Sequence, residues 1–132
     1  MPASRARTLA ILYFGGHAVL DLVWWAAVGT VDRFRGWFEL APHNHRVLNG
    51  FLLPDLVLLG VASFVAAVGL QRRWRGATAL AALTSGGSGY ATLYIISWVV
   101  TGGHGWMGAV AMSIETGVMV ALVVALVRLQ PE

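Results

Sequence analysis

The fold is decided by residues 47–76, which read VLNGFLLPDLVLLGVASFVAAVGLQRRWRG. An apolar run with one charged residue, Asp55, ends there at a cluster of arginines and a glycine. About 20 apolar residues in a helix are enough to cross the hydrocarbon core of a bilayer. Arginines mark the point at which a chain leaves the bilayer. The stretch therefore predicts a membrane span followed by a tight basic turn.

Apolar segments of similar length lie on both sides of this stretch. The predicted spans are residues 9–29, 47–70, 77–100 and 106–127. The first is longer than the apolar part of a signal peptide and contains His17 and Asp21, so it predicts a retained helix. We expect a single all-α domain over residues 1–132, a polytopic membrane protein built as a bundle of four transmembrane helices.

The composition excludes several classes of protein. Hydrophobic residues make up 58% of the chain and charged residues only 11%, whereas about 25% is usual for soluble domains. The absence of cysteine excludes disulfides, thiolate catalysis and iron–sulfur clusters. All basic residues are arginines, so a lysine Schiff base is also excluded. The arginines lie at the ends of apolar segments, which is typical of membrane topology and not of nucleic-acid binding.

The distribution of arginines predicts the orientation. One side of the predicted bundle carries Arg5, Arg7, Arg72, Arg73, Arg75 and Arg128. The other side carries Arg33, Arg35 and Arg46. Cytoplasmic loops are the richer in basic residues, so both termini are expected in the cytoplasm. The use of arginine alone is typical of a GC-rich bacterial genome, and we expect the cytoplasmic membrane of a bacterium.

The outer loop, residues 30–46, mixes aromatic and charged side chains. Phe34, Trp37 and Phe38 are expected to anchor it in the lipid headgroups. The loop also holds His43 and His45. With His104 in the second outer turn and His17 in the first span, these histidines allow a metal site to be considered. The spacings of strong metal sites are missing, so we expect no resident metal or cofactor.

Three carboxylic residues, Asp21, Asp55 and Glu115, lie inside the predicted spans. An aspartate at the centre of a transmembrane helix costs about 2.5–3.5 kcal/mol, and such residues usually face the interior of the bundle and serve a function. Asp21 follows His17 by four residues, which places both on one helix face. The pair is either a hydrogen bond that fixes helix packing or part of a site.

Aromatic and small residues extend this pattern. The residues expected to contact a substrate are Trp24, Trp25, Tyr90, Tyr94 and Met112. Pro54 before Asp55 predicts either a kink that opens a pocket or the start of the regular helix. Residues 85–89, SGGSG, favour close helix packing. Gly117, Ala121 and Ala125 form a small-residue stripe that could pack on a second copy of the chain.

Helix geometry places the polar residues at a common depth. At about 1.5 Å per residue, Asp21, Glu115 and Tyr90 fall near the middle of the membrane. Asp55 and Tyr94 fall somewhat nearer the outer face. This is the arrangement that a single polar pocket would need.

The first hypothesis is an intramembrane enzyme. A carboxyl group in apolar surroundings keeps its proton to higher pH and can act as a general acid. Asp21, oriented by His17, would be the acid or base, with Glu115 and Asp55 as complementary carboxylates. Isomerisation, cyclisation or epoxide opening of a lipophilic small molecule drawn from the membrane lipids fits this equipment. The alternatives are an oligomeric proton-coupled transporter and an accessory subunit whose polar residues only join helices.

Overall fold

The structure is a computed structural model that describes residues 3–41 and 45–128. All regular secondary structure in these two ranges is helical. The elements are α1 (Ala3–Thr30), α2 (Asp32–Phe38), α3 (His45–Asn49), α4 (Leu52–Pro54), the π-helical segment η1 (Asp55–Val61), α5 (Ala62–Gln71), α6 (Ala77–Gly102) and α7 (Trp106–Arg128). The elements from α3 to α5 follow one another along a single interrupted rod.

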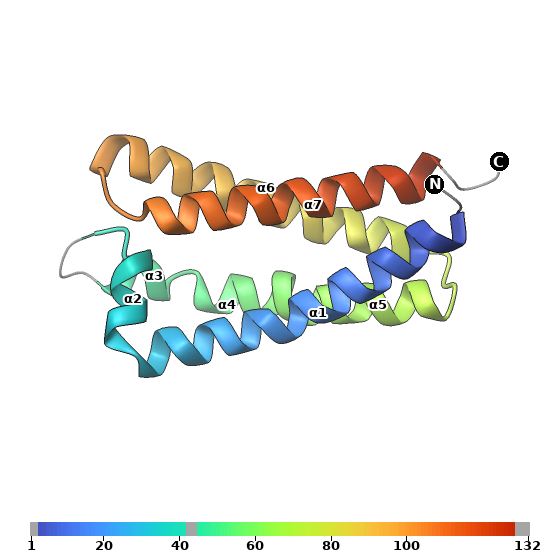
Figure 1. Cartoon of the computed structure of the whole chain (residues 1–132), viewed down its shortest axis with the longest axis horizontal. Helices are drawn as coiled ribbons and strands as arrows, with labels where there is room; N and C mark the ends of the chain where they lie inside the picture. The colour runs from blue at the N-terminus through green and yellow to red at the C-terminus, as the bar shows by residue number, and fades with distance from the viewer. Residues whose placement is uncertain (1–2, 42–44, 129–132) are drawn as a thin grey trace.

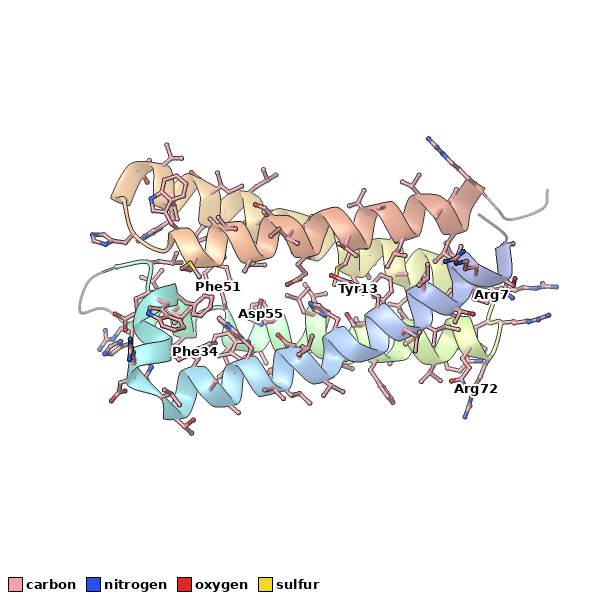
Figure 2. The ribbon with its side chains drawn as sticks, viewed as in Figure 1. Arg7, Tyr13, Phe34, Phe51, Asp55 and Arg72 are labelled. Atoms are coloured by element: carbon pink, nitrogen blue, oxygen red, sulfur yellow. The ribbon has the colours of Figure 1, made fainter. Side chains whose placement is uncertain are left out.

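Within residues 3–41 and 45–128, α1, the rod from α3 to α5, α6 and α7 run antiparallel in two layers. Figure 1 shows α1 beside the rod of α4, η1 and α5 in one layer, and α6 beside α7 in the other. The start of α1, the α5–α6 turn and the end of α7 lie at one end, here called the terminal end. Arg7 and Arg72 mark this end in Figure 2. The opposite end holds α2, α3 and the α6–α7 turn, and is here called the loop end.

In the described part of the chain, three helical stretches are long and apolar enough to cross a membrane, namely Ala3–Thr30, His45–Gln71 and Trp106–Arg128. They support an integral membrane protein and coincide with three of the four predicted spans. The remaining predicted span corresponds to α6, which has 26 residues and no charged side chain. Its serines, threonines and glycines lower its hydropathy. Large apolar side chains such as Leu12, Leu53 and Val100 stand exposed on the outside of the bundle, as lipid-facing residues do.

The terminal half of the bundle is closed by a packed apolar core. This core consists of Ala10, Phe14, Ala66, Ala67, Leu70, Ala77, Ala81, Met119 and Leu126. Its many alanines let the helices approach closely, and Phe14 and Met119 are completely buried. Toward the loop end the core divides into two smaller clusters, one around Val99 and one around Val28. Open space between the helices is therefore found in the loop half.

The rod formed by α3 to α5 is irregular where it approaches Asp55. Helix α3 ends at Asn49, residues 50 and 51 form a turn, and the helix resumes at Leu52. The regular helix therefore begins neither at Pro54 nor in an unbroken run from residue 47. Asp55 instead opens the π-helical segment η1. Such segments are rare and frequently lie at functional sites, because they widen the helix and redirect backbone groups.

Helix α2 covers the loop end of the bundle. Trp37 is half exposed, as expected of an interfacial anchor. The same prediction is wrong for Phe38, whose ring packs edge-on against Trp24 with the centroids 5.3 Å apart. Phe34 follows it inward, with its ring centroid 5.0 Å from that of Phe38. Phe34 and Phe38 pack against the cluster around Val28, whereas Trp37 contacts Phe34 from the outer side of α2.

The α6–α7 turn requires glycine at two positions of different character. Gly105 has a φ of +86°, and a Cβ there would lie 2.5 Å from Leu40 Cδ2. Gly103 has a φ of +74° but open space around it. Replacement of Gly103 by alanine should lower the free energy of unfolding by about 1–2 kcal/mol, the cost of left-handed backbone. Gly105→Ala should cost about 1–3 kcal/mol more, because Leu40 must also move.

Thermal unfolding in detergent, followed by circular dichroism, measures this difference. Equal losses for Gly103→Ala and Gly105→Ala would contradict the contact between Gly105 and Leu40. Gly16→Ala is a suitable control, because Gly16 lies within α1 with open space around it.

Candidate functional site

A cavity of about 340 Å³ lies between α1, η1 and α7 in the loop half of the bundle. All three carboxylic residues of the spans, together with His17, line it. The complete lining is Tyr13, His17, Leu20, Asp21, Trp24, Phe38, Asp55, Leu59, Gly108, Ala111, Met112, Ile114 and Glu115. Figure 2 shows two of these side chains, Tyr13 and Asp55, between the two layers. We call this space the carboxyl cavity.

His17 joins three helices through its two ring nitrogens. Its Nε2 lies 3.0 Å from Oε1 of Glu115 on α7, and its Nδ1 lies 3.3 Å from the carbonyl oxygen of Leu59 in η1. A carbonyl only accepts, so Nδ1 carries a proton. The Nε2–Oε1 contact then holds one shared proton, whether as imidazolium and carboxylate or as neutral imidazole and carboxylic acid. The pair can therefore store a proton or release one.

This arrangement corrects the predicted partner of His17. Asp21 shares its helix face, as the spacing predicted, but the hydrogen bond of His17 goes to Glu115. The hydroxyl of Tyr13 is hydrogen-bonded nearby to the backbone carbonyl of Glu115, at 3.2 Å. His17 is therefore hydrogen-bonded to a group on another helix, and not to Asp21, which lies four residues along its own helix.

A chain of hydroxyl groups meets Glu115 at Oε1, the same carboxyl oxygen that His17 contacts. Ser88 donates to Glu115 Oε1 at 3.0 Å and lies 2.7 Å from the hydroxyl of Thr116. The Thr116 hydroxyl is also 2.8 Å from that of Thr92. Sequence analysis assigned Ser88 to helix packing and missed both threonines. The signal for them was the spacing of Ser88 and Thr92, four residues apart on one face of α6.

Asp21 differs from Glu115 because it is buried without a partner. It is only 8% exposed, and its Oδ2 has no hydrogen bond. It interacts electrostatically with His17 and Glu115. Gly60 of η1 approaches so closely that a Cβ there would lie 3.1 Å from Asp21 Oδ2. A buried carboxyl oxygen without a donor is costly. Oδ2 is enclosed beside Gly60, while Asp21 as a residue lines the cavity.

Asp55 lies at the junction of two cavities. It lines the carboxyl cavity and also a second, larger one of about 590 Å³. Behind it stands Trp25, which is buried and lines neither of these two cavities. The Trp25 indole N–H interacts with Asp55, but the geometry falls short of a hydrogen bond and leaves the N–H unpaired. Trp25 therefore lies beside Asp55 and away from any molecule in the cavities.

The second cavity lies between the α3–η1 rod and α6, on the other side of Asp55. Its lining residues are Arg46, Val47, Gly50, Phe51, Pro54, Asp55, Leu58, Leu59, Gly87, Tyr90, Ala91, Tyr94 and Trp98. The predicted contact residues are thus divided between two spaces. Trp24 and Met112 line the carboxyl cavity, whereas Tyr90 and Tyr94 line the second one.

The remaining histidines lie away from the carboxyl cavity. His45 is hydrogen-bonded to Glu39 at the loop end, and His104 is exposed in the α6–α7 turn. His43 lies outside the described residues. Over residues 3–41 and 45–128, no group of three or more histidine or carboxylic side chains has the geometry to hold a metal ion.

No known protein family, curated protein or solved structure matches this chain. The function therefore has to be inferred from the chemistry of the cavities themselves.

Proposed function

We propose that this protein is an intramembrane enzyme that performs acid–base chemistry on a lipophilic small molecule. The observation that carries the proposal is the convergence of Asp21, Asp55, Glu115 and His17 on one cavity. Isolated structural carboxyl groups would not need to meet in open space. Paired acid and base groups in a water-poor pocket are what a proton-transfer reaction requires.

The arrangement suggests separate roles for the carboxyl groups. Asp21 lines the cavity, and its Oδ2 has no hydrogen bond that a reaction would have to break, so we assign it the contact with the substrate. Asp55 is the second carboxyl in reach of the same space. The Glu115–His17 pair is already hydrogen-bonded and acts as the proton store that resets the other two.

The proposed reactions balance without a cofactor. In an isomerisation, the acid adds a proton to one carbon of a double bond, and the carboxylate removes a proton from a neighbouring carbon. In an epoxide opening, the acid protonates the ring oxygen as its C–O bond breaks. Water then attacks the carbon and gives its proton to the carboxylate. Trp24 in the cavity wall offers a ring face that stabilises the developing cation.

The remaining walls suit a small apolar molecule. The apolar lining includes Leu20, Ala111, Met112 and Ile114. A volume of about 340 Å³ lies at the small end of the range for ligand pockets. The cavity therefore fits a small hydrocarbon unit with one polar or reactive group better than a large solute.

A proton-coupled transporter is the second candidate, and one observation favours it. Asp55 separates two cavities, as a gate between two compartments would. Both cavities lie in the loop half, however, and the packed core around Phe14 and Met119 closes the terminal half. A carrier needs polar access from both ends. An accessory subunit would in turn need a partner for Asp21 Oδ2, which has none.

The experiment that tests the enzyme is a turnover assay in deuterated water. Purified protein in detergent is incubated with lipophilic alkenes and epoxides, and products are analysed by mass spectrometry for isomers, diols and incorporated deuterium. The enzyme predicts catalytic deuterium incorporation or diol formation in detergent, where no second compartment exists. A carrier predicts substrate movement in sealed vesicles and no chemical change.

The proposal includes a fourth span and a cytoplasmic location for both termini. The length of α6, its lack of charged residues and its alignment with α7 support the span, and the arginines at the terminal end support the orientation. The bacterial cytoplasmic membrane and pairing of two copies through Gly117, Ala121 and Ala125 stay predictions. Gly117 and Ala121 are exposed on α7, as that pairing requires.

Single cysteines test this topology, because the native chain has none. Gly36 and Gly76 lie at opposite ends, and a Cβ at either has open space around it. In right-side-out vesicles, a membrane-impermeant maleimide should label Gly36→Cys but label Gly76→Cys only after the membrane is permeabilised. Labelling of both from the same side would rule out an odd number of crossings between them, and with it the proposed topology.

A further inference from the structure

The second cavity has the shape and chemistry of a lipid-chain site. We propose that it binds one hydrocarbon chain of an anionic amphiphile, with the head group at Arg46 and the chain directed toward Asp55. The inference rests on the proposed function in one respect, since it names the class of substrate that reaches the carboxyl groups. The binding itself does not depend on catalysis.

The walls of this cavity are almost entirely apolar or aromatic. Phe51, Tyr94 and Trp98 form a continuous aromatic side, with ring centroids 5.5 Å apart for Phe51 and Tyr94 and 6.3 Å apart for Tyr94 and Trp98. Leu58 and Leu59 continue the lining inward. Such walls bind hydrocarbon by removing it from contact with water or headgroups.

The cavity is open toward the surrounding lipid between η1 and α6. Tyr90, which lines it, is 75% exposed, and Pro54 and Tyr94 are also exposed. Gly87 contributes no side chain on the α6 side. Helix α6 packs closely on α5 and α7 but only loosely on η1. A chain can therefore enter sideways from the bilayer without passing through water.

Charge is confined to the two ends of the cavity. Among the described residues that line it, Arg46 is the one cationic side chain, and it lies at the loop end, where lipid head groups are expected. A guanidinium has five N–H donors and binds carboxylates and phosphates by paired hydrogen bonds, even when it has another contact. Asp55 is the one anionic side chain in the lining. The two lie at different levels of the interrupted α3–η1 rod, on the order of 10 Å apart at about 1.5 Å per helical residue, a distance that a hydrocarbon chain can span.

The shared position of Asp55 connects this site to the chemistry. A chain held at Arg46 would place its inner portion beside Asp55, which also lines the carboxyl cavity. The substrate class is therefore a single-chain lipid with an anionic head group and a double bond or epoxide within the chain. A carboxylate or a phosphate head group fits Arg46 equally well, and a neutral alcohol does not.

Direct binding tests this site. Tritiated hexadecanoic acid is bound to the full chain in detergent and competed with unlabelled hexadecanoic acid, farnesyl phosphate or hexadecanol. Both anionic ligands should compete at least about tenfold better than the alcohol, given the strength of charge-assisted hydrogen bonds. Arg46→Gln should remove that preference, whereas Arg33→Gln at the same end should keep it. Carboxylate and phosphate are told apart by which anion competes more strongly.

A second pair of variants tests the cavity. Ala91→Trp fills it and should weaken binding of all three ligands at least about tenfold, whereas Ala82→Trp on an exposed face of α6 should leave binding unchanged. Binding that survives Ala91→Trp, or an equal affinity for acid and alcohol, would overturn the inference. Binding without turnover of any unsaturated or epoxidised chain would remove the proposed enzyme and leave the site. Turnover of neutral substrates without binding of anions would remove the lipid-chain site and leave the proposed enzyme.

Discussion

Replacement of Asp21 by asparagine is expected to lower turnover by at least about 100-fold, the usual contribution of a general acid or base, and to leave the protein as stable as before or more stable. The side chain is buried, and its Oδ2 has no hydrogen-bond partner. Asparagine has nearly the same shape and does not have to be buried as a charged group. Activity and stability should therefore change in opposite directions.

This combination separates a functional residue from a structural one. If Asp21 only joined helices, its replacement would lower the melting temperature, and activity would fall with the fraction of folded protein. Asp32→Asn is the matched control, because Asp32 lies in α2 with a side chain that is 97% exposed. It should change neither quantity. A clear loss of stability in Asp21→Asn, with unchanged turnover per folded molecule, would exclude Asp21 as the acid or base.

Glu115 should behave in the opposite way, because its Oε1 is bonded to both His17 and Ser88. Glu115→Ala removes the partner of His17 Nε2 and the acceptor of the Ser88 hydroxyl. Each buried polar group left unpaired costs about 1–3 kcal/mol, so the free energy of unfolding should fall clearly. Ser88 can turn to Thr116, 2.7 Å away, which leaves His17 as the main loss.

Glu115→Gln distinguishes packing from proton storage. Glutamine can place its amide nitrogen at the position of Oε1 and donate to a neutral His17, while Ser88 donates to Thr116. It should therefore recover most of the stability lost in Glu115→Ala. It cannot give up a proton, so activity should stay low. Unfolding in detergent and the turnover assay measure the two effects on the same samples. Recovery of both by glutamine would mean that Glu115 only positions His17.

The spacing of polar residues predicted which side chains are important but not how they pair. His17 and Asp21 share a face by helical periodicity, and the structure keeps both on the wall of the carboxyl cavity. The choice of Glu115 as hydrogen-bond partner depends on how α7 is rotated toward α1. Rotation about a helix axis is set by the packing of whole helix faces, such as the alanine-rich core near Phe14. A local sequence pattern does not determine that rotation.

The same limit explains the division of the predicted pocket. Tyr90 and Tyr94 were expected around the same space as Asp21 and Glu115 because their depths are similar. Depth follows from the 1.5 Å rise along each helix, but α6 directs its tyrosines toward η1 and away from Glu115. Two residues at one depth can therefore lie on opposite sides of an intervening rod, here the segment that carries Asp55.

The sequence by itself determined the apolar helices, the ends marked by arginine, and the three carboxylic residues within the spans. These features are local, since hydropathy and helical period act over a few turns. Only the tertiary structure decided that His17 bonds to Glu115, that η1 brings Leu59 and Gly60 against α1, and that Asp55 lies between two cavities. Those outcomes depend on which faces of separate helices meet, and that is settled by the packing of the whole bundle.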